Sequence, residues 1–189
     1  GEVIFPGTYA LTNKSMRLSD VVKLAGGTSS LAYVKGAKLN RLMNAEERAR
    51  FAASLNMLEN TADSASVAKL EAASNYTVGI DLEAALDEPG SDADLVLREG
   101  DVIVVPEYIN TVKVTGCVLY PNTITYDSKM SVNDYVEQAG GFGFRAKKNR
   151  AYVVYMNGTV AKARRSSKGV VEPGCEIIIP EKQKKEGSL

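Results

Sequence analysis

The sequence contains no histidine and no tryptophan among its 189 residues. Histidine is the commonest general base and the commonest zinc ligand, so its absence excludes the most frequent forms of acid–base and zinc chemistry. No catalytic serine or cysteine motif and no glycine-rich nucleotide loop is present either. We therefore expect a protein without catalytic residues, metal or cofactor, which is a binding or assembly part rather than an enzyme.

Cysteine is scarce, with only Cys117 and Cys175. Their spacing does not match a metal-binding motif. Two interpretations remain open: one disulfide bond, or two buried thiols.

Long apolar runs are also absent. No stretch approaches the ~18 apolar residues that a membrane-spanning helix needs, and no charged-then-apolar leader opens the sequence. With 44% apolar and 24% charged residues, the composition is typical of a globular protein. The length predicts one or two domains.

The net charge is zero, but the two parts of the chain differ in sign. Residues 1–115 carry 11 Lys and Arg against 16 Asp and Glu, a net charge of −5, whereas residues 116–189 carry 12 against 7, a net charge of +5. Chance scatter, head-to-tail packing of acidic on basic modules, and a basic face for a polyanion all fit this pattern. The zero total and the acidic first part argue against a nucleic-acid partner.

Three sequence blocks occur twice in the same order. The segment 1–8 matches 116–123, and 18–27 matches 132–141. The closing segment 96–107 matches 170–181 with an offset of 74, against 114 for the preceding block. The first copy therefore contains an insertion of 40 residues.

Each copy has the same predicted elements. Short runs at 3–5 and 118–120 end at a turn containing Pro and are followed by strands at 8–11 and 123–126, which together predict a β-hairpin. A short helix follows, capped in the second copy by Ser131 and ended in both by a Gly pair, 26–27 and 140–141. The runs 39–42 and 151–156 predict further strands.

The last block of each copy predicts a central strand. The runs 102–105 and 177–179 are continuously apolar, which is typical of a strand buried on both faces. Each copy is thus a hairpin, a helix and further strands, which is the order of a β-grasp fold. The strand predicted at 111–115 leads into Gly116, and we expect a corresponding strand upstream of Gly1.

The chain divides into three predicted parts. Residues 1–108 form the first domain, with a helical insertion at about 43–75, and residues 109–182 form the second. Within the insertion, Asn44 caps a helix to Leu58 that packs on its own module or faces a partner, and a second short helix follows at 66–73. The segment 76–82 resumes the strand pattern and 86–94 is a loop. Residues 183–189 are a charged tail.

These segments together resemble a known family. The pattern V-x-x-P-G-x-Y from Val3, L-x-D-x-V-x-x-A-G-G over Leu18–Gly27 and L-R-E-G-D-V-I-V-V-P over Leu97–Pro106 resembles the SLBB family, the soluble-ligand-binding β-grasp domains. The second copy departs from it at Asn122 and Cys175. The resemblance implies an α+β fold of two tandem β-grasp domains, with the helical insertion outside the common pattern.

Tandem SLBB domains look like the periplasmic part of Wza-type outer-membrane polysaccharide export proteins. The resemblance implies a non-catalytic, periplasmic part of an outer-membrane-associated protein that forms a ring of identical subunits lining a conduit for capsule or exopolysaccharide. It also implies contact with the inner-membrane export machinery. The family's export domain and lipoprotein signal are not in this sequence.

The alternative function is a soluble ligand- or glycan-binding module. Without Trp, the aromatic platforms for a sugar would come from Tyr9, Tyr120, Tyr126, Tyr152 and Tyr155, which equally fit strand packing. A basic cluster fits either an acidic glycan site or a solvated face. Its members are Arg145, Lys147, Lys148, Arg150, Lys162, Arg164 and Arg165.

Overall fold

The computed structural model describes residues 1–58 and 75–184. Contacts divide the chain into two compact units. The first comprises residues 1–29 and the described part of 37–105, and the second comprises residues 30–36 and the chain from Pro106 onward. Both units are mixed α and β, so the predicted α+β class is confirmed.

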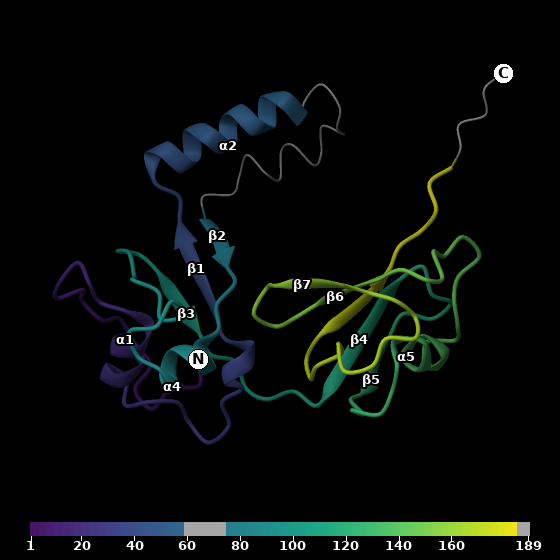
Figure 1. The fold of residues 1–189 in the computed structure, drawn as a ribbon, viewed down its shortest axis with the longest axis horizontal. Coiled ribbons are helices and arrows are strands. Elements are labelled where there is room, and N and C mark those ends of the chain that lie inside the picture. Colours follow the sequence, from purple (N-terminus) through teal and green to yellow (C-terminus); the bar gives the residue numbers. More distant parts are fainter. Residues whose placement is uncertain (59–74, 185–189) are drawn as a thin grey trace. The chain divides into compact units, whose positions relative to one another are not determined.

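The second unit has a five-stranded sheet in the order β5-β4-β8-β6-β7, labelled in Figure 1. β4 pairs antiparallel with β5 and parallel with β8, and β6 pairs antiparallel with both β8 and β7. This order, with a helix between the hairpin and the later strands, is the predicted β-grasp arrangement. The elements are β4 (Thr111–Gly116), β5 (Asn122–Thr125), α5 (Val132–Gln138), β6 (Ala151–Val154), β7 (Val160–Ala163) and β8 (Glu176–Ile179).

α5 covers the core of this unit because its sequence both starts the helix and supplies apolar side chains. The Ser131 hydroxyl accepts from the Asp134 N–H (3.3 Å), and the Asp134 carboxylate accepts from the Ser131 N–H (2.8 Å), which is a reciprocal capping box. Tyr135 and Val136 are fully buried with Val114 in one cluster. The predicted cap and helix are therefore confirmed.

The first unit contains a three-stranded sheet in the order β2-β1-β3. Both pairings are antiparallel, with Leu39 opposite Val78 on one side and Ile103 on the other. These strands correspond to β7, β6 and β8 of the second unit. The elements are α1 (Leu18–Leu24), the 3-10 turn η1 (Val34–Gly36, grouped with the second unit), β1 (Lys38–Leu42), α2 (Ala45–Leu58), β2 (Asn75–Val78), α4 (Leu82–Asp87) and β3 (Val102–Val104).

The sequence repeat reappears in the backbone hydrogen bonds. The segment before each helix and the segment after it make the same contacts in both copies, with nearly the same lengths. Matching N–H to O=C pairs are Glu2 to Val105 and Cys117 to Ile179 (both 2.7 Å), Ile4 to Gly27 and Leu119 to Gly141 (both 3.0 Å), Phe5 to Ala25 and Tyr120 to Ala139 (2.8 and 2.9 Å), and Tyr33 to Pro106 and Lys147 to Pro180 (2.8 and 2.9 Å).

The predicted hairpin differs from the observed one. β5 pairs with β4, not with the run 118–120, which makes an isolated bridge from Val118 to Phe142. A run of three residues ending at Pro121 is short for a strand, while β4 supplies six residues and the alternating buried pair Val112 and Val114. Residues 8–11 of the first unit are likewise not a strand.

The closing runs behave differently in the two units. β8 lies between β4 and β6 as predicted, whereas β3 ends its sheet, because among the described residues only β1 pairs with it. A second difference is α4, which lies where a strand end and a loop were predicted. Asp81 caps this helix by accepting from the Ala84 N–H at 3.0 Å.

The insertion begins as predicted. Asn44 accepts from the Glu47 N–H at 2.8 Å and starts α2, which stands beyond the end of β1 in Figure 1. Of its described side chains only Glu47 and Phe51 are partly buried, and Glu47 pairs with Arg98. The predicted helix at 66–73 and most of the charged tail lie outside the described residues.

The segment 30–36 groups with the second unit rather than with its sequence neighbours. The Tyr33 ring packs edge-on against Tyr108 at 5.6 Å, and burial raises the pKa of Tyr33 to about 12. The domain boundaries at 108 and 182 stay a prediction.

The two cysteines are free thiols in the structure. Cys175 lies in the core of the second unit and Cys117 is partly exposed. Burial raises the pKa of the Cys175 thiol to about 11, which keeps it protonated at neutral pH.

Candidate functional site

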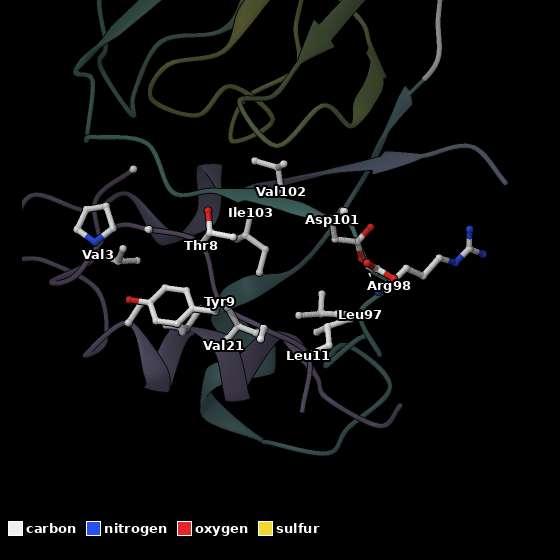
Figure 2. A pocket seen from close by; sticks show the side chains of 18 of the residues that line it. Val3, Thr8, Tyr9, Leu11, Val21, Leu97, Arg98, Asp101, Val102 and Ile103 are labelled. Carbon is white, nitrogen blue, oxygen red and sulfur yellow. Dashed lines mark hydrogen bonds between the residues drawn. The ribbon is translucent and has the colours of Figure 1, made fainter. Parts of the chain in front are cut away.

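A groove of about 1260 Å³ runs through the first unit. One wall is the irregular segment 6–11, the other is the segment 97–105 with β3, and α1 contributes Val21, Val22 and Ala25. Figure 2 shows Ile103 pointing toward Tyr9 and Val21, while the side chain of Val102, which also lines the groove, extends to the other side of β3. The groove is thus apolar at its centre and is lined along β3 by Val102 and Ile103.

The wall formed by α1 is positioned by Asp94, which is 1% exposed. Its carboxylate accepts from the Ser19 N–H (2.9 Å), the Ser19 hydroxyl (2.6 Å) and the Gly90 N–H (2.9 Å). Burial alone would raise the pKa of Asp94, but these hydrogen bonds and the Arg17 charge hold it below its usual value. The carboxylate therefore stays ionised and ties the start of α1 to the loop after α4.

The charged groups at the end of the groove hold the fold together. Asp101 receives two hydrogen bonds from Arg41, at 2.9 and 3.1 Å, and one from the Arg98 N–H at 2.8 Å. Arg98 extends away from the groove in Figure 2 and pairs with Glu47, whose pKa is lowered by that hydrogen bond. The paired Asp101 stabilises the turn before β3.

The structure brings only part of the predicted basic cluster together. Ala151 of β6 lies opposite Ala163 of β7, so Arg150 and Arg164 flank the same end of this hairpin. Both are exposed, as are Lys148, Lys162 and Arg165, while Lys147 is partly buried. Arg145 instead donates to the Lys182 carbonyl at 2.7 Å and lies 3.6 Å from the Glu181 carboxylate. The cluster as a glycan site therefore stays a prediction, with Arg150 and Arg164 as its centre.

The tyrosines do not form a common platform. Tyr120 is 73% exposed beside Gly140, Tyr9 lines the groove of the first unit, and Tyr155 donates to the Val170 carbonyl at 2.5 Å. Tyr152 lies in β6 opposite Lys162. Tyr126 and Tyr155 pack against the core of the second unit. Tyr152 is the one of the five whose strand partner belongs to the basic cluster, and the exposed Tyr120 lies apart from that pair in the run 118–120.

The sequence analysis did not predict the groove. The walls of the groove come from the segments 6–11 and 97–105, which lie far apart in the sequence, and no local pattern of residues predicts that they come together. Within residues 1–58 and 75–184 no group of side chains is suited to hold a metal ion, and no helix there is long and apolar enough to cross a membrane.

Comparison with known proteins supports the resemblance. The chain is 33% identical over 137 residues to two sequences of the polysialic acid transport protein KpsD of Escherichia coli. The match covers 72% of this chain and 23% of each relative, so the chain spans about a quarter of their length. The SLBB domain model matches residues 1–52 and 111–163, one segment in each repeat and more than half of the chain. With the repeated hydrogen bonds and the β-grasp order of the second unit, this match shows that the chain belongs to the SLBB domain family.

Proposed function

We propose that the chain is a non-catalytic part of a capsule or exopolysaccharide export apparatus, in which it assembles with copies of itself and lines the conduit. The observation that carries the proposal is the 33% identity to a polysialic acid transport protein across 72% of the chain. We further propose a periplasmic location within an outer-membrane-associated protein, and contact with inner-membrane export machinery. These proposals concern the whole export protein, of which the matched region is 23% in the relatives.

The physical character of the site agrees with an assembly role. Asp94 and Asp101 are each tied to backbone N–H groups or to arginine. Carboxylates held in this way fix the conformation of the backbone around the groove. Two scaffold copies of opposite net charge also supply complementary surfaces for repeated contacts between subunits.

Deletion of the gene tests the export proposal. Cells without the protein should make the polysaccharide but fail to display it, and the polymer should accumulate inside the cell. Complementation with the intact gene should restore surface staining, while a gene lacking the region of residues 1–182 should not. Normal surface polysaccharide after deletion would rule out the export role.

The second candidate is binding of an acidic glycan, supported by the exposed pair Arg150 and Arg164 at one end of the β6–β7 hairpin. Polysialic acid oligomers are a suitable probe because each residue carries a carboxylate. The double variant Arg150→Gln/Arg164→Gln should weaken binding at 20 mM salt by about tenfold, because an exposed ion pair contributes up to about 1 kcal/mol. The matched control is Lys129→Gln, an exposed cation elsewhere in the second unit.

Salt dependence separates this candidate from the conduit role. Binding through exposed charges should fall when salt rises from 20 to 500 mM, because ions screen the attraction. Equal binding of the double variant and the control would eliminate the basic cluster as a glycan site. The export experiment would stand unaffected by that result.

A further inference from the structure

A second hollow, of about 700 Å³, lies in the second unit along β5 and reaches the end of α5. Among the described residues that line it, only Asp127 is charged. We propose that this hollow, here called the polar hollow, binds a neutral sugar ring of the exported polysaccharide together with the neighbouring Tyr120. The inference rests on the proposed export function and adds the chemical class of one sugar unit. The amide and hydroxyl side chains of the lining are those of Asn122, Thr123, Thr125, Ser128 and Gln138.

The lining of the polar hollow suits a sugar without charge. All five amide and hydroxyl side chains are exposed. Amide and hydroxyl groups can both donate and accept hydrogen bonds, as the hydroxyls of a sugar do. No lysine or arginine is found among the described residues of this lining, so an acidic sugar would gain no ion pair there, and Asp127 would repel its carboxylate. The chemistry therefore favours a neutral sugar over an acidic one.

The walls of the polar hollow are held in place by hydrogen bonds. The buried Tyr135 hydroxyl donates to the Asp127 carbonyl and accepts from the Asp127 N–H, each at 2.9 Å. The Met130 N–H donates to the same carbonyl at 3.1 Å and closes a turn. On the opposite wall, the Asn122 side chain accepts from the Thr123 N–H at 2.8 Å. Walls that are ordered before binding reduce the entropy that a ligand must overcome.

Tyr120 presents an exposed aromatic ring next to the polar hollow. Its side chain is 73% exposed, while its N–H donates to the Ala139 carbonyl at 2.9 Å. A Cβ on Gly140 would lie 2.6 Å from the Tyr120 ring, so the ring rests against backbone that has no side chain. Asn122 and Gln138, which line the hollow, are two residues from Tyr120 and one from Ala139. The negative face of such a ring attracts the C–H groups on one face of a pyranose.

The first unit repeats the aromatic ring but not the polar lining. Phe5 takes the place of the tyrosine and is 65% exposed, and a Cβ on Gly26 would lie 2.9 Å from its ring. Leu24 and Gly7 stand where the second copy has its two amides. The shared scaffold therefore places the ring, whereas the groups that can bind sugar hydroxyls are particular to the second copy.

The test uses oligosaccharides released by mild acid from the surface polysaccharide of the cells that make the protein. They are titrated into the isotope-labelled full chain, and the amide signals of Thr123 and Gly140 are followed by NMR. Both signals should shift and saturate. Tyr120→Ala should raise the Kd at least about fivefold because the stacking face is lost, whereas Tyr120→Phe keeps that face and should stay within about threefold of the wild type.

Two further variants make the test specific to the polar hollow. Gln138→Leu introduces the residue of the first copy and should raise the Kd at least about fivefold, because a sugar hydroxyl loses its partner. The matched control is Phe144→Ala, which removes an aromatic side chain of the same unit that is 100% exposed and does not line the hollow. Absence of shifts at Thr123 and Gly140, or equal effects of Tyr120→Ala and Phe144→Ala, would overturn the proposal.

Salt and sugar composition separate the polar hollow from the other candidates. Binding of a neutral sugar should be the same at 20 and 500 mM salt, because no ion pair is screened. Shifts centred on Arg150 and Arg164 that vanish at high salt would assign the polymer to the basic pair and overturn the proposal, as would a polymer without neutral sugar units. If gene deletion still blocks export in that case, the export function stands and only this inference fails.

Self-association at Tyr120 is the remaining alternative. Without oligosaccharide, the Gly140 signal should not change as the protein concentration is raised. A shift that grows with protein concentration and disappears in Tyr120→Ala would assign the exposed ring to a contact between copies of the chain and overturn the proposal.

Discussion

At the scale of single residues, the polar side chains of this protein act mainly on the backbone. Asp94 holds two N–H groups and a hydroxyl, and the Tyr135 hydroxyl both donates to the Asp127 carbonyl and accepts from its N–H, each at 2.9 Å. Both side chains are almost fully buried. A buried polar group with partners stabilises one backbone conformation and is costly to disturb.

Asp94→Asn should lower the free energy of unfolding of the first unit by about 1–3 kcal/mol, because at least one buried N–H or hydroxyl loses its charged acceptor. The pKa of Asp94 is lowered in the folded chain, so its stabilising effect is present above the unfolded value of about 3.9 and is lost as pH falls through the folded value. Urea unfolding at pH 7, 5 and 3 measures both effects.

The exposed Asp92 on the same loop supplies the control for this variant. Asp92→Asn should change the stability of the first unit by less than about 0.5 kcal/mol. If the wild type and Asp94→Asn lose stability equally between pH 5 and pH 3, the assigned role of the Asp94 carboxylate is wrong.

At the scale of elements, the exit of β4 is constrained by the backbone of β8. Gly116 has φ +83°, and a Cβ there would lie 2.3 Å from the Ile179 carbonyl oxygen and 2.9 Å from its nitrogen. Both contacts are with backbone of β8, which is fixed between two strands. Glycine is therefore required for conformation and for space.

Gly116→Ala should destabilise the second unit at least twice as much as Gly169→Ala. Gly169 has a similar φ of +76° with no atom within 4 Å of its built Cβ, so that variant shows the cost of the left-handed conformation alone, about 1–2 kcal/mol. Chemical denaturation of the two variants gives the comparison. Equal losses would mean that β8 moves aside at no cost.

At the scale of the whole chain, two copies of one scaffold carry opposite charge. The part up to residue 115 has a net charge of −5 and the remainder +5. In the proposed assembly of identical subunits, this difference in net charge would favour head-to-tail contacts, which close into rings when the rotation between subunits allows. The charges would influence the rate and register of such contacts more than their final strength.

The proposed self-association of the chain should therefore weaken when salt is raised from 50 to 500 mM, because the Debye length falls from roughly 14 to 4 Å. Sedimentation velocity at both salt concentrations measures the change. Self-association that is unchanged or stronger at high salt would show that apolar contacts, and not the charge difference, hold the subunits together.

The repeat, both ends of α5, the end of α1, the start of α2 and the β-grasp order were predictable from the residues, whereas α4 was not. Ser131 with Asp134, and Asn44 with Glu47, mark helix starts through contacts within one turn. The Gly pairs after α1 and α5 mark helix ends in the same local way, with positive φ at all four residues. Signals of this kind depend only on residues that are close in sequence, so helix ends can be predicted from them without the tertiary structure.

The pairing partners were decided by the tertiary structure. The hairpin strand of the second unit proved to be β4 and not the run 118–120, because a ladder needs length and a buried alternating face as well as β propensity. The same applies to β3, whose apolar sequence indicates a central strand although only β1 pairs with it among the described residues. The groove beside β3 depends on how segments far apart in the sequence pack together. The placement of Arg150 and Arg164 at one end of the β6–β7 hairpin depends on the register of the two strands. No local pattern of residues specifies either of these features.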